Sequence, residues 1–281
     1  MTSFQILILA LIQGIAELLP VSSSAHVIMA EKLMGLDPTS PAMTLLLVML
    51  HTGTMFAVIV YFWKAWKVSY FSSWRQLRQQ LGYLVMATLV TALVGLGLQY
   101  WIAHQFAADA STFEIEQLFG NARLMAAALA AAGVLIMASS KLREGTKPLS
   151  MRKAAIIGAV QGLCLPFRGF SRSGATISTG LVCGLARIQA EEFSFALAVV
   201  LTPPVVVKEA LRLHHANAQL SENQIQAMAD LIAPGLLGMG LSFLAGLLAL
   251  RWLSRWLKAD RWHFFGGYCL VASVFVYWLG T

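Results

Sequence analysis

Apolar stretches of about twenty residues recur along the whole chain. A helix of that length spans the roughly 30 Å of hydrocarbon in a bilayer. Charged residues make up only 12% of the 281 residues, about half of what a soluble domain carries. The sequence therefore predicts an all-α polytopic membrane protein and argues against a soluble fold. The predicted full spans are residues 42–62, 82–104, 120–140, 191–212, 229–250 and 262–280.

Two further apolar regions, 4–36 and 153–186, are interrupted midway by polar residues. The interruptions are Pro20-Val21-Ser22-Ser23-Ser24 and Arg168-Gly169-Phe170-Ser171-Arg172-Ser173-Gly174. Each arm is too short to cross a bilayer, which needs about 20 residues. We predict that each region is a re-entrant helix pair, whose turn lies inside protein or beside water. A single kinked span in each region is the alternative.

Short motifs repeat in the same order in the two halves of the chain, at nearly constant spacing. The matched pairs are Gln13-Gly14 with Gln161-Gly162, Ser22–Ser24 with Ser171–Ser173, and Gly35-Leu36 with Gly184-Leu185. The spans that follow are predicted to break at matching places, at His51–Thr54 and Thr202–Pro204. The repetition predicts two related halves, residues 1–140 and 150–281.

Each half is expected to hold one re-entrant pair and three full spans. An odd number of crossings turns the second half upside down, so the two halves form inverted-topology repeats. Transporters and related proteins of this design place a polar site where the repeats meet. We therefore expect the two polar interruptions to build one site.

Basic residues are concentrated in the segments 63–81, 141–153 and 251–261, whereas 105–119 and 213–228 are acidic or nearly neutral. The net charge of +7 thus follows the positive-inside rule and does not indicate a nucleic-acid partner. The first three segments are predicted to be cytoplasmic and the other two external. With two re-entrant pairs, both termini then lie outside.

The first interruption holds an acid, hydroxyls and an imidazole within a short stretch. Gln13 and Glu17 lie four residues apart, so they share one face of a helix that must point into protein or water. Pro20 ends that arm, and the serines begin the next, where Ser is a favoured N-cap. His26 follows Ser23 by about one turn and is expected to face it. Plain helix capping by the serines and a structural contact of Glu17 are the alternatives.

The second interruption is suited to binding an anion. Arg172 lies between Ser171 and Ser173 and is followed by Gly174 and Thr176. A helix beginning here points free N–H groups and its positive dipole end at the interruption. A guanidinium and hydroxyls bind phosphate oxygens by charge-assisted hydrogen bonds. Together the two interruptions predict a site for a phosphorylated, lipid-soluble substrate.

At these motifs the sequence resembles the undecaprenyl-diphosphatase family of bacteria, known for bacitracin resistance. Three stretches carry the resemblance over the length of the chain. They are Gln13 and Glu17 with Pro20-Val21-Ser22-Ser23 and His26, then Gly169-Phe170-Ser171-Arg172-Ser173-Gly174-Ala175-Thr176, and last Glu192-Phe193-Ser194-Phe195.

The resemblance implies a hydrolase of the bacterial inner membrane. Its substrate would be a C55 polyprenyl diphosphate, from which it removes the terminal phosphate to give undecaprenyl phosphate for peptidoglycan synthesis. The rival interpretation is a polyprenyl-phosphate transporter or flippase without hydrolysis, because inverted repeats are common in transporters. The sequence leaves a homodimer open.

The resemblance also implies roles for single residues. Ser23 would be the nucleophile, Arg172 would bind the phosphate, and Glu17 and His26 would be the acid–base groups. The substrate-binding residues would be Gln13, Ser22, Ser24, Ser171, Ser173, Gly174 and Thr176.

The family is associated with Mg²⁺ or Ca²⁺, for which Glu17 is the candidate ligand. A single carboxylate cannot enclose a metal, so the cation would be held largely by diphosphate and water. His51, Glu191 and Glu192 are weaker candidates. Three departures from the family pattern concern metal dependence and substrate range: Gln13 replaces the commoner Glu, Ser24-Ala25 replaces Thr-Gly, and Arg168 replaces Pro.

Overall fold

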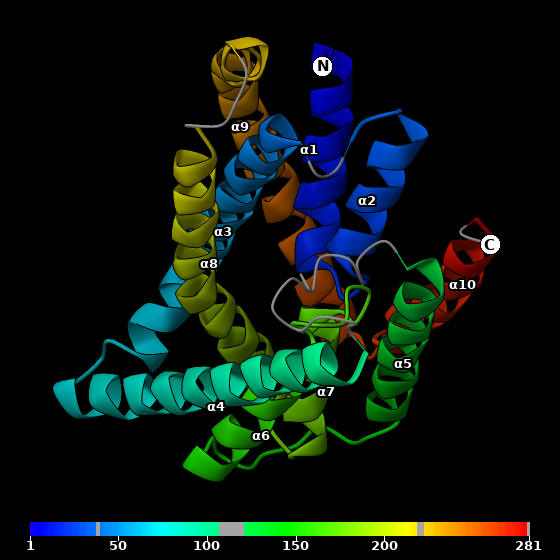
Figure 1. The fold of residues 1–281 in the computed structure, drawn as a ribbon. Coiled ribbons are helices and arrows are strands. Elements are labelled where there is room, and N and C mark those ends of the chain that lie inside the picture. Colours follow the sequence, from blue (N-terminus) through cyan, green and yellow to red (C-terminus); the bar gives the residue numbers. More distant parts are fainter. Residues whose placement is uncertain (38–39, 107–120, 218–221, 280–281) are drawn as a thin grey trace.

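The computed structural model describes residues 1–37, 40–106, 121–217 and 222–279, and all regular secondary structure in these ranges is helical (Figure 1). The predicted all-α class is therefore confirmed. The helices are α1 (Ser3–Leu18), α2 (Ser23–Leu33), α3 (Pro41–Ser69), α4 (Trp74–Phe106), α5 (Ala122–Ser140), α6 (Met151–Leu163), α7 (Arg172–Val182), α8 (Arg187–Asn217), α9 (Glu222–Lys258) and α10 (His263–Leu279).

Five of the described helices, α3, α4, α5, α8 and α9, are long and apolar enough to cross a membrane. They correspond to the first five predicted spans, and the chain is a multi-pass membrane protein. The predicted sixth span coincides with α10, which is apolar but has only 17 residues in the described part of the chain. A crossing by α10 therefore stays a prediction.

The helices extend beyond the apolar stretches that predicted them. Helix α3 continues to Ser69 and α4 begins at Trp74, so most of the basic segment 63–81 is helical. Lys and Arg have high helix propensity, and their long side chains carry the charge away from the hydrocarbon. Segments 105–119 and 213–228 lie partly outside the described residues.

The predicted breaks at His51–Thr54 and Thr202–Pro204 are wrong, because α3 and α8 are continuous through these positions. The threonines satisfy their hydroxyls within the helix. Thr52 donates to the Val48 carbonyl at 2.8 Å, and Thr202 donates to the Ala198 carbonyl at 2.8 Å. Pro inside a membrane helix is tolerated where neighbouring groups satisfy the freed backbone.

Both interrupted regions form pairs of helices rather than one kinked helix. Figure 1 shows α2 returning beside α1, and α6 packs against α7 lower in the same view. Both second helices end at a glycine with positive φ, Gly35 at 67° and Gly184 at 79°. The leucine that follows each glycine bonds back to the helix, Leu36 to Glu31 at 2.9 Å and Leu185 to Gly180 at 3.0 Å. The repeated dipeptide thus makes the same C-terminal turn twice.

The two interruptions meet in the interior. The Ser173 hydroxyl donates to the Leu19 carbonyl at 3.3 Å, and the Cys269 thiol of α10 donates to the Pro20 carbonyl at 3.2 Å. Helix α7 is buried over residues 173–181. Helix α1 packs tightly on α9, where a Cβ at Gly14 would lie 2.7 Å from the Ser242 carbonyl oxygen. This close packing fixes the end of α1 that carries Gln13 and Glu17.

Candidate active site

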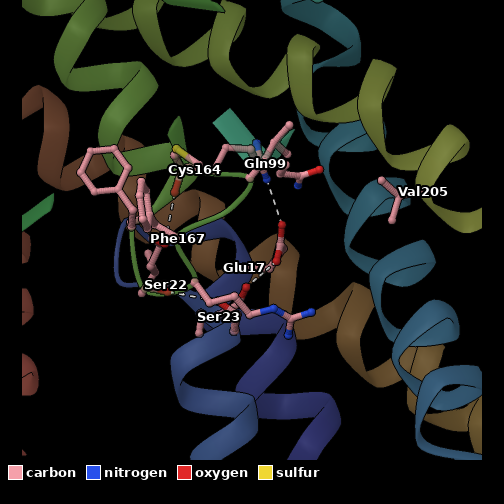
Figure 2. Close-up of a pocket in the computed structure, with 16 residues that line it drawn as sticks. Glu17, Ser22, Ser23, Gln99, Cys164, Phe167 and Val205 are labelled. Atoms are coloured by element: carbon pink, nitrogen blue, oxygen red, sulfur yellow. Dashed lines mark hydrogen bonds and ion pairs between the residues drawn. The ribbon is translucent and has the colours of Figure 1, made fainter. Parts of the chain in front are cut away.

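A cavity of about 340 Å³ opens between the two interruptions. Both polar breaks line it, together with Gln99 of α4 and Val205 of α8. Figure 2 shows Glu17 and Ser23 facing each other, with Val205 apart from them on α8. The lining residues in and just before the first break are Ala16, Glu17, Leu19, Ser22, Ser23 and Ser24, and those in and just before the second are Cys164, Leu165, Phe167, Arg168, Phe170, Ser171, Arg172 and Ser173.

The Glu17 carboxylate, in the last turn of α1, joins the two breaks. It accepts a hydrogen bond from Ser23 Oγ at 2.6 Å and one from Arg172 Nη2 at 2.9 Å. Gln13 Nε2 lies 3.3 Å from Glu17 Oε2, as expected for residues one turn apart. The imidazole of His51 approaches the same oxygen at 3.7 Å. The Glu17 side chain is largely removed from water, and a charge in that setting requires such partners. The network holds one carboxylate between a hydroxyl and a guanidinium.

Ser22 forms the turn that directs Ser23 toward Glu17. Ser22 has φ 67° and ψ 92°, and it is the N-cap of α2 without a side-chain cap hydrogen bond. Its hydroxyl instead lies 3.3 Å from that of Ser24. The capping interpretation is therefore wrong for this helix. A non-glycine residue in the left-handed region is strained, and such strain is concentrated at functional sites.

His26 does not face Ser23, contrary to the expectation from one-turn spacing. Its Nδ1 lies 2.8 Å from the Ser22 carbonyl oxygen, and its Nε2 lies 2.6 Å from the hydroxyl of Tyr268. Both ring nitrogens thus have partners other than the Ser23 hydroxyl. The only base that contacts Ser23 among the described residues is Glu17.

Helix α7 begins at Arg172, and its N-terminus borders the cavity. Ser171 is the N-cap, and its hydroxyl accepts from the Gly174 N–H at 3.3 Å. The Nη1 atom of Arg172 is buried and makes no hydrogen bond with any described residue. A guanidinium nitrogen without an acceptor, next to the positive end of a helix, favours an anion.

Thr176 lies behind this surface, away from the cavity. Its hydroxyl lies 2.8 Å from the Arg172 carbonyl oxygen and 2.6 Å from Ser194 Oγ. Ser194 belongs to the third motif, which therefore packs behind the second. These contacts support the N-terminal turn of α7 rather than extend the cavity lining.

The weaker metal candidates on α8 do not line the cavity. Glu191 accepts from the Ser254 hydroxyl, and Glu192 accepts from the Ser69 hydroxyl at 3.2 Å. Within the described part of the chain, no group of three His, Cys, Asp or Glu side chains is arranged to hold a metal ion. Glu17 and His51 approach each other, but they are only two.

Several residues near the site were not predicted. Gln99 and Phe167 line the cavity, and Tyr268 contacts His26. Gln99 is a polar residue within an apolar span, a signal that favours a role inside the protein. Nothing in the local sequence distinguishes Phe167 or Tyr268 from the many aromatic residues around them.

The family described as Bacitracin resistance protein BacA matches residues 6–275, nearly the whole chain. The chain belongs to this family. The motifs that define the cavity all lie within the matched region.

Named relatives agree with this membership. Undecaprenyl-diphosphatase 2 of Acinetobacter baylyi is 61% identical over 274 residues, covering 97% of this chain and 96% of the relative. Undecaprenyl-diphosphatase 1 of Burkholderia pseudomallei is 32% identical, covering 98% of this chain and 96% of the relative. The undecaprenyl-diphosphatase of Korarchaeum cryptofilum is 30% identical, and 96% of each chain is covered.

Proposed function

We propose that the protein is an undecaprenyl-diphosphatase, a hydrolase that releases the terminal phosphate of a C55 polyprenyl diphosphate. The product, undecaprenyl phosphate, is then available again for peptidoglycan synthesis. Membership of the family and the 61% identity to a relative of this name support the activity. The observation that carries the proposal is the carboxylate of Glu17, which bonds the Ser23 hydroxyl and the Arg172 guanidinium at once.

The reaction begins at Ser23. A serine hydroxyl is a weak nucleophile until a neighbouring base removes its proton, and Glu17 lies 2.6 Å away to accept it. The Ser23 oxygen attacks the terminal phosphorus, and the bond from that phosphorus to the bridging oxygen breaks. Lipid monophosphate leaves with the bridging oxygen. Water then hydrolyses the phosphoserine, releasing inorganic phosphate and restoring the hydroxyl.

The second break binds the transferred phosphate. Arg172 turns from Glu17 toward the phosphate oxygens, and the N–H groups at the start of α7 add to the positive field. Ser171 and Ser173 form this surface together with Ser22 and Ser24 from the first break. Gly174 and Gln13 lie behind it, where Gly174 bonds the Ser171 hydroxyl and Gln13 bonds Glu17. Thr176 supports the surface through its contacts with Ser194 and the Arg172 carbonyl.

A divalent cation, Mg²⁺ or Ca²⁺, fits the site as a companion of the substrate. The cavity offers one carboxylate, Glu17, and no enclosing set of ligands among the described residues. Mg²⁺ is commonly bound through one or two carboxylates and substrate phosphates, with water completing its shell. The cation would offset charge on the diphosphate, and Glu17 is its protein ligand in this proposal.

The proposed architecture is two inverted repeats in the bacterial plasma membrane. Each repeat holds one re-entrant pair, α1–α2 or α6–α7, and three full spans, with both termini outside. The matching glycine turns after α2 and α7 support the internal repeat. A homodimer is compatible with this architecture.

Phosphate release separates hydrolysis from transport. Purified protein in detergent should release inorganic phosphate from undecaprenyl diphosphate, and Ser23→Ala should abolish the release. A chelator should suppress turnover, and added Mg²⁺ or Ca²⁺ should restore it. Binding of the lipid without phosphate release would favour the transporter and refute the proposed activity.

A further inference from the structure

His26 is held at both ring nitrogens, and the second partner comes from the far end of the chain. The Ser22 carbonyl lies 2.8 Å from Nδ1, and the Tyr268 hydroxyl of α10 lies 2.6 Å from Nε2. The rings of His26 and Tyr268 are stacked, with centroids 5.7 Å apart and planes inclined by 16°.

These contacts fix which nitrogen carries the proton. A backbone carbonyl can only accept, so Nδ1 of His26 must donate to it. In the neutral ring Nε2 is then an acceptor, and the Tyr268 hydroxyl donates to it. Tyr268 thus selects the tautomer that holds the Ser22 carbonyl.

The held carbonyl belongs to the strained residue of the site. Ser22 has φ 67°, a conformation that is strained for a non-glycine residue and persists only where its surroundings enforce it. Ser23 is the next residue, so the direction of its hydroxyl toward Glu17 depends on this turn. The contact from His26 is one of the surroundings that enforce it.

The setting of Tyr268 agrees with such a role. Tyr268 is 48% exposed, and α10 otherwise exposes apolar residues such as Val271 and Phe275. A hydroxyl in an apolar environment is costly without a partner, and His26 provides that partner.

We propose that Tyr268 is a positioning residue, which acts through His26 to hold the Ser22 turn and thereby aims Ser23 at Glu17. This inference rests on the proposed function, in which Ser23 is the nucleophile. It assigns no proton transfer with substrate to either His26 or Tyr268.

The first test is Tyr268→Phe, which removes one hydrogen bond and keeps the stacked ring. Loss of a single such bond predicts a fall in kcat of about three- to tenfold, with KM and thermal stability nearly unchanged. Tyr277→Phe, the same substitution further along α10, is the matched control and should leave kcat unchanged. An unchanged kcat in Tyr268→Phe would overturn the proposal.

The second test replaces His26 by amides that mimic one nitrogen each. Asn places its amide near the Nδ1 position and retains the donor to Ser22, whereas Gln places its amide near Nε2 and loses that donor. We expect His26→Asn to retain clearly more turnover than His26→Gln. Equal loss in both variants would indicate a general base instead and would refute the positioning role.

The third test is the double variant. Because Asn does not reach Tyr268, adding Tyr268→Phe to His26→Asn should lower kcat no further, whereas independent structural effects would multiply. A further fall in kcat in the double variant would overturn the coupling between the two residues. The wild type serves as the reference throughout. If the wild type releases no phosphate, the proposed function fails. If it releases phosphate and these substitutions do not change kcat, only the positioning role is refuted.

Discussion

The carboxylate of Glu17 allows the sharpest test of the mechanism, because it accepts from both Ser23 and Arg172. In Glu17→Gln the side chain keeps its shape. Its single amide oxygen can serve Arg172, but then its NH₂ group faces the Ser23 hydroxyl and cannot take the proton. Removal of a general base lowers the rate by about 10²- to 10⁴-fold, which corresponds to roughly 3–5 kcal/mol of transition-state stabilisation.

At saturating Mg²⁺ or Ca²⁺, which compensates for the loss of Glu17 as a metal ligand, the same substitution should not weaken substrate binding. Arg172 loses the carboxylate at 2.9 Å that competes with the diphosphate for its guanidinium, so KM should stay equal or fall. The assay is release of inorganic phosphate from undecaprenyl diphosphate in detergent, over a range of substrate concentrations. A low kcat with an equal or lower KM distinguishes the loss of a base from the loss of a binding group.

The matched control is Glu192→Gln. Glu192 also accepts a hydrogen bond from a serine, Ser69, at 3.2 Å, but it does not line the cavity. Its kcat should remain within about twofold of wild type, because a uniform loss of one distant hydrogen bond does not change transition-state stabilisation. If Glu17→Gln keeps more than a tenth of wild-type kcat, less than about 1.4 kcal/mol has been lost, and Glu17 is not the base.

Three further predictions follow from the site and the charge pattern. Ser23→Ala should lose several orders of magnitude in kcat and Ser24→Ala much less; retention of a tenth of the activity in Ser23→Ala would exclude it as the nucleophile. Arg172→Lys should fold, as judged by its melting temperature, but its turnover should be well below a tenth of the wild-type value, because an ammonium cannot bind phosphate in the bidentate manner of a guanidinium. Near-normal turnover would contradict the proposed phosphate contact. Single cysteines introduced in 105–119 should react with an impermeant thiol reagent added outside intact cells, whereas those in 63–81 should not; the reverse pattern would invert the orientation.

The sequence predicted the helical spans well and their ends poorly. The length of an apolar stretch identifies the part of a helix that lies in hydrocarbon. Helices α3 and α9 continue beyond it through basic residues, which lie outside the hydrocarbon and carry no such signal. The breaks assigned to α3 and α8 were wrong for a related reason. Threonine hydroxyls bond to carbonyls one turn back, so polar residues in an apolar span do not by themselves end a helix.

The site was predictable where one helix determines the geometry. Gln13 and Glu17 share a face of α1, and their side chains meet at 3.3 Å. One-turn spacing was misleading for His26, because its two ring nitrogens bond to the Ser22 carbonyl and the Tyr268 hydroxyl instead of the Ser23 hydroxyl. The partner of that ring, Tyr268, lies 242 positions away, and no local pattern connects residues so distant.

Arg172 and Glu17 form an ion pair across the cavity at 2.9 Å, and this pair has a consequence for the end of the catalytic cycle. In the free protein the carboxylate occupies the guanidinium that, in the proposed mechanism, binds a phosphate oxygen during turnover. When inorganic phosphate has formed, Glu17 competes with it for Arg172 from within the protein, at a local concentration that no product reaches in solution. The carboxylate of Glu17 thus acts as an internal anion that displaces the product phosphate from Arg172. We expect free phosphate to be a weak inhibitor and to leave readily, although the site is built to hold the same group during its transfer.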